Sequence, residues 1–155
     1  MLCSFLRTFI VAALALTHAI AFAGDRIGQV KVASGDVTIQ RDGGEIMAKA
    51  GEPLFEKDTI VTGENSAVGM TFTDNSRMSL GPESTLSLES YIYSRPGRPN
   101  SFDARLQSGS LTAASGKIAK SRPLAMRVLM PTTVLGVKGT VLAARVAADD
   151  DGAVQ

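Results

Sequence analysis

Cysteine and histidine are almost absent from this sequence. Cys3 is the sole cysteine and His18 the sole histidine, and both fall within the first 23 residues. If processing removes these residues, no thiol and no imidazole remain. That excludes cysteine nucleophiles, a Ser-His-Asp triad, disulfides, and zinc or copper sites built on His or Cys. A chain without free thiols also suits an oxidising compartment.

Aromatic residues are scarce as well. Tryptophan is absent and aromatics make up 5% of the chain, so aliphatic residues and six methionines must fill the core. Few aromatic rings also weigh against a stacking platform for sugars. A mature chain of more than about one hundred residues can bury one core without disulfides, so we expect a single domain.

Neither sign of charge dominates. The chain has 16 Lys and Arg against 15 Asp and Glu. Because a general nucleic-acid binder is usually clearly basic, no nucleic-acid partner is expected. The distribution is uneven, however. Residues 36–89 are rich in acids, whereas Asp103 is the single acid between Arg95 and Lys138.

This one-sided charge leaves two interpretations open. Either oppositely charged faces of one domain neutralise each other, or the basic stretch contacts an acidic partner, with an envelope protein as the expected partner. Under the second interpretation, the candidate partner surface consists of Arg95, Arg98, Arg105, Lys117 and Arg122.

Residues 1–23 have the pattern of an export signal. Arg7 supplies a positive start, residues 8–21 form an uncharged apolar run, and Ala21-Phe22-Ala23 is a small-x-small cleavage site. We therefore expect cleavage after Ala23 and a periplasmic or secreted mature protein. The alternative is a transmembrane anchor, but the run is short of the ~20 residues that a span needs.

Apolar residues alternate with polar ones over residues 68–88. They stay at even-numbered positions on both sides of two polar breaks. A period of two predicts strands with one buried face. We expect a β meander in which Phe72 faces Met78 and Leu80 faces Leu86 across short loops.

Turn signals divide the rest of the chain. A tight turn at Ser34-Gly35 would place Val32 opposite Val37, and Asp42-Gly43 suits a type I′ hairpin turn. Two prolines and a glycine predict a long loop at residues 94–101. Further strands are expected at 102–106, near Leu111, at 124–130 and at 141–146.

The sequence thus predicts an all-β fold. Its expected parts are a signal peptide (1–23), a β domain (24–148) and an acidic C-terminal tail (149–155).

Several short motifs in this order resemble the FecR domain family. They cover most of the predicted mature chain and comprise a first hairpin (28–39), Gly-x-x-Leu (51–54), Asp-x-Ile-x-Thr-Gly (58–63), Phe-x-Asp-x-Ser (72–76), Leu-Gly-x-x-Ser (80–84), Leu-x-x-Gly-x-Leu (106–111) and Gly-x-x-Gly-Thr (136–140).

The resemblance implies a twisted, solenoid-like arrangement of short antiparallel strands, with a two-sheet sandwich as the alternative. It also implies a non-catalytic periplasmic protein-interaction module in envelope sensing or assembly, without a cofactor. A glycan- or cell-surface-binding β domain is the functional alternative. The polar motif residues are expected to bond the backbone of their own turns, and they are Asp58, Ser66, Asp74, Ser76 and Ser84.

Two departures from the family pattern affect function. Family members that act as iron-regulatory anti-sigma factors carry a helical segment and a membrane span before this domain, and neither is expected here, so control of a sigma factor is not implied. The family also tends to continue with a further strand pair, so either this is a short version or a partner supplies the last pairing.

No motif supports an enzyme. Asp74 and Glu83 could be imagined as a glycosidase pair, but their spacing does not favour them over other acids. A Ser-Lys dyad using Lys138 has no supporting motif.

Overall fold

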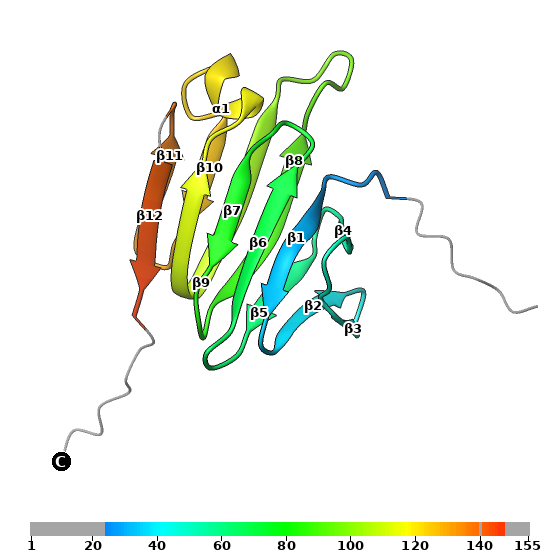
Figure 1. Ribbon diagram of the computed structural model, residues 1–155. Helices are drawn as coiled ribbons and strands as arrows, with labels where there is room; N and C mark the ends of the chain where they lie inside the picture. Colours follow the sequence, from blue (N-terminus) through cyan, green and yellow to red (C-terminus); the bar gives the residue numbers. More distant parts are fainter. Residues whose placement is uncertain (1–23, 140, 148–155) are drawn as a thin grey trace, which may run out of the picture.

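The structure, a computed structural model, describes residues 24–139 and 141–147. Within these ranges the chain forms twelve strands and one short helix (Figure 1), which confirms the all-β prediction. In chain order the elements are β1 (Gly28–Ser34), β2 (Val37–Arg41), β3 (Gly44–Met47), β4 (Pro53–Leu54), β5 (Thr59–Thr62), β6 (Ala67–Phe72), β7 (Arg77–Leu80), β8 (Thr85–Ile92), β9 (Ser101–Ala114), α1 (Lys117–Ser121), β10 (Met126–Leu129), β11 (Val134–Val137) and β12 (Val141–Val146).

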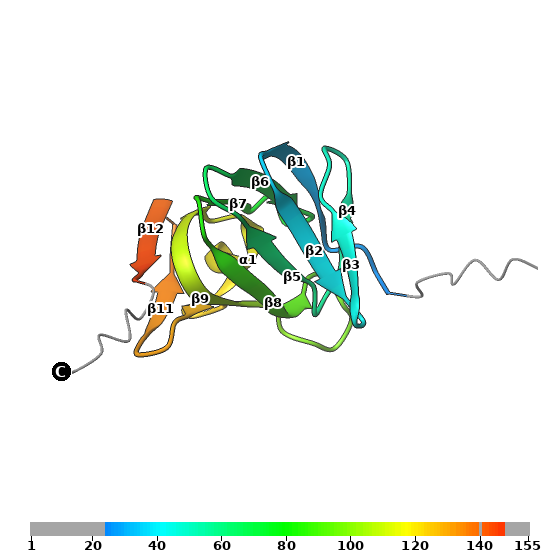
Figure 2. The same cartoon turned by 90° about the horizontal axis from the view of Figure 1, so that it is seen from below.

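The strands form a strongly curled sheet whose two layers share β9. The first layer has the order β4-β1-β6-β7-β9-β12, and the second has the order β3-β2-β5-β8-β9-β10-β11. β9 is long enough to pair with β8 through its first part and with β7 through its last part. The described pairs are antiparallel except that of β9 with β10. Figure 2 shows the strands curling around a common interior.

The chain passes between the two layers at tight corners. β1 lies in the first layer and β2 in the second, so the predicted pairing of Val32 with Val37 is wrong. Val32 lies beside Gly69 of β6 instead and is 59% exposed. The alternating apolar residues switch from even to odd positions at this corner. Such a switch marks a corner, but it does not show whether the next strand stays in the same layer.

The predicted meander is correct only for one hairpin. β6 and β7 pair, but Met78 lies opposite Met70 rather than Phe72. Leu80 and Leu86 are in different layers, because the chain crosses from β7 to β8 between them. Their predicted pairing is therefore wrong, although both side chains are buried.

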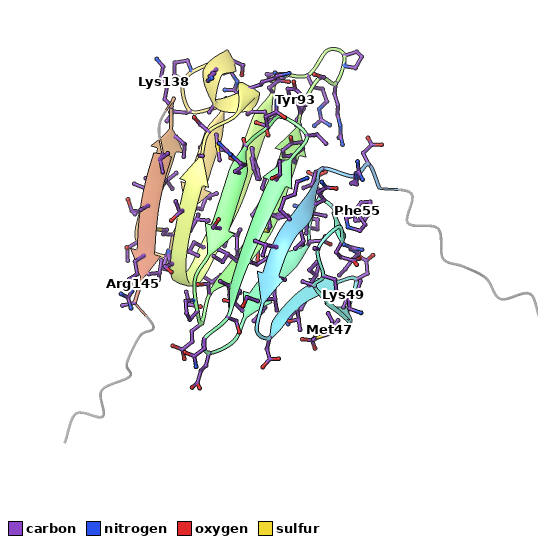
Figure 3. All side chains as sticks on the ribbon, viewed as in Figure 1. Met47, Lys49, Phe55, Tyr93, Lys138 and Arg145 are labelled. Atoms are coloured by element: carbon purple, nitrogen blue, oxygen red, sulfur yellow. The ribbon has the colours of Figure 1, made fainter. Side chains whose placement is uncertain are left out.

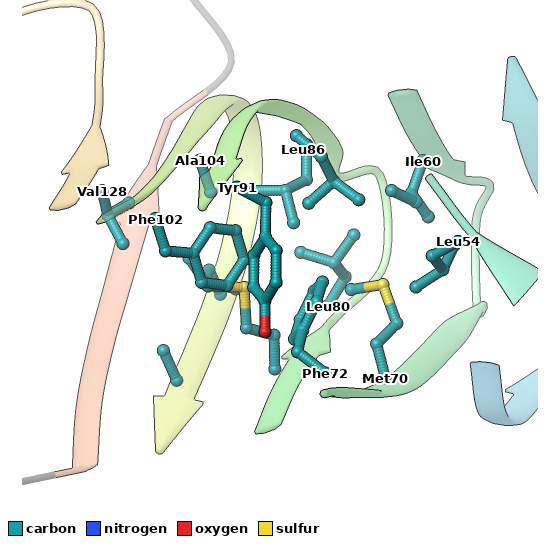
Figure 4. Close-up of a cluster of buried hydrophobic side chains, with 14 of the residues drawn as sticks. Leu54, Ile60, Met70, Phe72, Leu80, Leu86, Tyr91, Phe102, Ala104 and Val128 are labelled. Carbon is teal, nitrogen blue, oxygen red and sulfur yellow. The ribbon is translucent and has the colours of Figure 1, made fainter. Parts of the chain in front are cut away.

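The alternating residues do form the buried face. Phe72 is 2% exposed and packs with Tyr91 and Phe102 at ring-centroid distances from 4.7 to 6.0 Å (Figure 4). Aliphatic and methionine side chains from both layers complete the same core, among them Leu54, Ile60, Met70, Leu80, Leu86, Ala104 and Val128.

The predicted turn at Asp42-Gly43 is confirmed. Both residues have positive φ (48° and 78°), as a type I′ turn requires, and Ile39 lies opposite Ile46 across the hairpin. The predicted last strand coincides with β12.

The prediction around Leu124 is wrong. Leu124 is 63% exposed with a φ of 57°, and the strand begins only at Met126. The helix α1, which precedes it, was not predicted. The predicted loop at 94–101 does connect β8 to β9.

The predicted signal peptide (1–23) and acidic tail (149–155) lie outside the described residues. α1 has five residues, and none of the helices in the described ranges has the length and hydropathy of a membrane span.

Candidate functional site

The loop between β8 and β9 and the helix α1 lie at the same end of the curled sheet (Figure 1). Together they bear four of the five residues predicted to form a partner surface. Arg95 and Arg98 are in the loop, Lys117 begins α1, and Arg122 follows it. These four residues are termed the basic end.

Two hydrogen bonds hold the β8–β9 loop, one across its base and one near its tip. Ser94, which has a φ of 53°, donates its N–H to Oδ1 of Asn100 at 3.0 Å. The N–H of Arg98 donates to the carbonyl of Arg95 at 3.3 Å. The two prolines of the loop lack an N–H and prevent it from continuing as paired strands. Arg98 is exposed at the tip and Arg95 is half-exposed.

A buried carboxylate holds α1 on the sheet. Asp74, in the turn between β6 and β7, is fully buried, and its Oδ2 accepts the N–H of Ile118 at 3.1 Å. Its backbone carbonyl accepts the N–H of Lys117 at 2.8 Å. Ser76 donates its hydroxyl to the same carboxylate (2.6 Å) and accepts the N–H of Gly116 (3.1 Å). These bonds satisfy backbone groups that a helix start otherwise leaves without partners.

Tyr91 on β8 joins this network to the aromatic core. Its hydroxyl donates to Oδ1 of Asp74 at 3.1 Å and accepts the N–H of the same residue at 2.9 Å. Burial raises the pKa of Tyr91 well above its ordinary range, so the hydroxyl keeps the proton that it donates. The part of the basic end that α1 carries is therefore held by a buried hydrogen-bond network.

Arg105 does not belong to the basic end. It lies on β9, four residues beyond Ser101, which is about 13 Å along a strand. Its Nε donates to Oε1 of Glu89 on β8 at 3.1 Å. The structure thus places four of the predicted residues at one end of the sheet and separates the fifth. Of the four, Arg95 lies in a crevice with Asp25 and Glu56 beside the β4–β5 connection.

Ion pairs neutralise part of the predicted surface. The first is the Arg105–Glu89 pair. The second is a largely exposed pair in which Nη2 of Arg95 lies 3.5 Å from Oδ2 of Asp25. Exposed pairs of this kind contribute little to stability. Among the described residues, no ion pair involves Arg98, Lys117 or Arg122. Internal neutralisation therefore accounts for two of the five cations.

Sequence reasoning missed α1 and, with it, the exposed Lys120 at the same end. The local signal in the sequence was the apolar pair Ile118-Ala119 between two lysines, and the structure buries both residues of this pair. The bond that places the helix joins Ile118 to Asp74, 44 residues earlier in the chain. No local pattern reveals such a contact.

The polar residues of the corner motifs are bonded within the fold. Asp58 accepts a backbone N–H of its own turn at 2.8 Å and holds Arg41 through two bonds of 2.7 Å. Ser66 and Ser84 each accept a backbone N–H from a distant corner at 2.9 Å. Ser66 and Ser84 also donate to carbonyls of their own turns, and Asp74 accepts the N–H of Ser76. The expected turn bonds are thus present for these residues and Asp58, whereas the hydroxyl of Ser76 bonds the carboxylate of Asp74 and a distant N–H instead.

The carboxylates considered for catalysis are far apart. Asp74 is buried in the turn before β7, whereas Glu83 is exposed in the corner after it. Among residues 24–139 and 141–147, no three His, Cys, Asp or Glu side chains are grouped so that they could hold a metal ion.

A family model described as FecR protein matches residues 58–155, which is more than half of the chain. This chain belongs to the FecR family. In the described structure the matched region runs from the end of the β4–β5 connection to β12, so it includes the basic end and the Asp74 network that supports it.

No curated protein is significantly similar to this chain. A solved structure described as a cell surface anchoring domain is 30% identical, with a TM-score of 0.42. The similarity covers 48% of this chain and 100% of that one.

Proposed function

We propose that this FecR-family chain is an exported, non-catalytic protein-interaction domain of the cell envelope, in sensing or assembly, which contacts an acidic envelope protein through its basic end. The observation that carries the proposal is the basic end itself. It presents Arg98, Lys117 and Arg122 to solvent without an ion pair among the described residues. Asp74 fixes the helix that Lys117 begins, and Arg98 lies on the loop at the same end of the sheet. Surface loops on a rigid scaffold are frequent binding sites.

Export is supported by the sequence pattern of residues 1–23. A periplasmic location would also suit a mature chain that has neither cysteine nor histidine.

A glycan-binding function is the weaker candidate. Phe72, Tyr91 and Phe102 are buried in the core, so their faces cannot stack on a sugar. Phe55 is half-buried, and the guanidinium of Arg41 lies 4.5 Å above its ring.

Charge reversal tests the proposed surface. The double variant Arg95→Glu/Arg98→Glu should lose capture of an envelope protein in cross-linking experiments on periplasmic extract and leave the melting temperature within about 2 °C of wild type, since both residues lie on an exposed loop. A matched control, Lys31→Glu/Lys49→Glu, makes the same charge change at two exposed positions near β1 and β3.

The two interpretations of the charge predict opposite results. If the loop variant melts earlier but captures the same protein as wild type, the cations only balance the acids of the first half. The proposed surface is then wrong.

A further inference from the structure

The C-terminal side of the fold ends in two strands with one neighbour each. Among the described residues, β11 pairs only with β10, and β12 pairs only with β9. Figures 1 and 2 show both strands at the margin of the curled sheet. The outer edge of such a strand presents backbone N–H and C=O groups that another strand can bind.

β12 is also incompletely covered on its inner face. Leu142, Ala144 and Val146 pack against the core but stay partly exposed. On the other side of β9, the inward-facing side chains of β7 are fully covered, since Met78 and Leu80 are buried. The apolar row of β12 can therefore gain cover from one more strand.

Two crevices flank the end of β12. One, of about 410 Å³, lies against the turn between β10 and β11 and is lined by Gln107, Met130, Thr133 and Arg145. The other, of about 320 Å³, lies against the corner before β8 and shares Arg145, Val146 and Ala147 with the first. Side chains of an added strand would find room on either side of Arg145.

Bases dominate the charge around this edge, where the one nearby acid among the described residues is exposed Glu83, which lines the second crevice together with Arg145. Between Asp103 and Asp149 the sequence has no acid and seven bases. Glu89 pairs with Arg105, and Asp103 pairs with Arg127. Arg145 is exposed on β12 and forms no ion pair with a described residue. In Figure 3 it lies at the end of β12 away from α1, apart from the basic end.

We propose that the outer edge of β12 accepts an extended acidic segment of a partner protein as an added strand. Main-chain hydrogen bonds would provide the affinity, as in other cases of strand addition. Alternate apolar residues of the segment would cover the inner row of β12, and its acidic residues would pair with Arg145. A second copy of this chain fits less well, because pairing of β12 with itself would bring two basic edges together.

This proposal rests on the proposed function only in requiring a protein partner, since the two surfaces differ. The probe is a fluorescent peptide of about eight residues that alternates valine with glutamate, which is long enough to span β12. Its control replaces glutamate by lysine. Anisotropy should show that the glutamate peptide binds the wild-type chain and that the lysine peptide does not.

Arg145→Glu should weaken binding of the glutamate peptide about tenfold or more and allow the lysine peptide to bind, at an unchanged melting temperature. Lys31→Glu, the same charge change on β1, should leave both affinities as in wild type. Equal loss in both variants would mean that the peptide follows net charge alone, and would overturn the proposal.

The mode of binding has its own measurement. Amide hydrogen exchange should slow in Val141–Val146 when the glutamate peptide is added. A peptide N-methylated at every residue should bind at least about tenfold more weakly, because neither of its edges has an N–H to donate to β12. If protection falls on α1 and the 93–100 loop instead, or if Arg95→Glu/Arg98→Glu alone removes binding, strand addition is wrong and the proposed function stands.

Other occupants of the edge can be recognised. Self-association in light scattering that Arg145→Glu abolishes would identify a second copy. Peptide binding that appears only after removal of residues 148–155 would identify this chain's own segment. Either result would overturn the proposal.

Discussion

At the scale of single residues, two kinds of side chain decide the stability of the domain. Apolar residues such as Phe72 fill the space between the layers, and a few polar residues such as Asp74 bond elements that are distant in sequence. Tyr91 belongs to both kinds, because its ring packs in the core and its hydroxyl bonds the buried carboxylate.

Phe72→Ala should lower the free energy of unfolding by about 3–5 kcal/mol, since the lost ring leaves a cavity between Tyr91 and Phe102. Ser79→Ala, on the exposed face of β7, should change it by about 0.5 kcal/mol or less. Denaturant titrations of the two variants provide the comparison. Equal losses would contradict the assignment of the two faces.

Tyr91 should make stability sensitive to alkali. In the unfolded chain a tyrosine ionises with a pKa of about 10, whereas burial raises the pKa of Tyr91 in the folded state. The contribution of this residue is therefore complete below about pH 10. Above that pH the unfolded state loses its proton first, so stability should fall by up to about 1.4 kcal/mol per pH unit.

Tyr91→Phe should remove this slope from denaturant titrations between about pH 9 and 11. At neutral pH the variant should be less stable by about 1–3 kcal/mol, because Asp74 loses a hydrogen bond in a buried site. Because Tyr93 is present in both proteins, the difference between them is informative: a larger rise in tyrosinate absorbance near pH 10 in the folded wild type than in folded Tyr91→Phe would show that the pKa of Tyr91 is not raised.

At the scale of elements, the corners and the shared strand β9 determine the architecture. β9 leaves the second layer and enters the first near Gly109, which has a φ of 84°. A Cβ at this position would overlap with Oγ of Ser84 and lie 2.5 Å from its Cα. Only a residue without a Cβ allows β9 to pass the corner before β8 so closely.

Gly109→Ala should destabilise the domain by about 3 kcal/mol, from backbone strain and from the clash with Ser84 together. Gly97→Ala is the matched control, because Gly97 has a φ of 71° in an open loop with no atom within 4 Å of its Cβ position. Its loss should be about 1 kcal/mol from the backbone alone. Thermal unfolding of both variants measures the difference, and equal shifts would show that the close approach to Ser84 costs nothing.

At the scale of the whole molecule, charges of opposite sign are concentrated in different parts of the chain. Several cations of the last third lie at or beside α1 and one, Arg145, lies on β12, while acids are concentrated in the first half of the chain. Such a molecule can present basic surfaces and still be nearly neutral overall, which keeps its contacts specific rather than generally attractive to polyanions.

Export should produce a chain that begins at Gly24. We expect intact mass and N-terminal sequencing of protein secreted by a bacterial host to show this start. Ala21→Arg/Ala23→Arg should block cleavage, because the processing site accepts only small residues. A wild-type protein that retains Met1 in the membrane fraction would contradict the prediction.

The sequence by itself determined the fold class, the buried face of most strands, the type I′ turn at Asp42-Gly43 and the order of the family motifs. These features are local: a period of two follows from the pleat of a strand, and a turn type follows from the φ values that its residues allow. Phe72 could therefore be assigned to the core without knowing which strand it faces.

Only the tertiary structure decided which strands pair, where α1 lies and which cations lie at the same end of the sheet. Either layer satisfies the same alternation, so nothing in the pattern distinguished Gly69 from Val37 as the neighbour of Val32. The bond from Asp74 to α1 and the separation of Arg105 from Arg98 depend on contacts between residues far apart in the chain. Such contacts result from packing the whole domain, and no local preference encodes them.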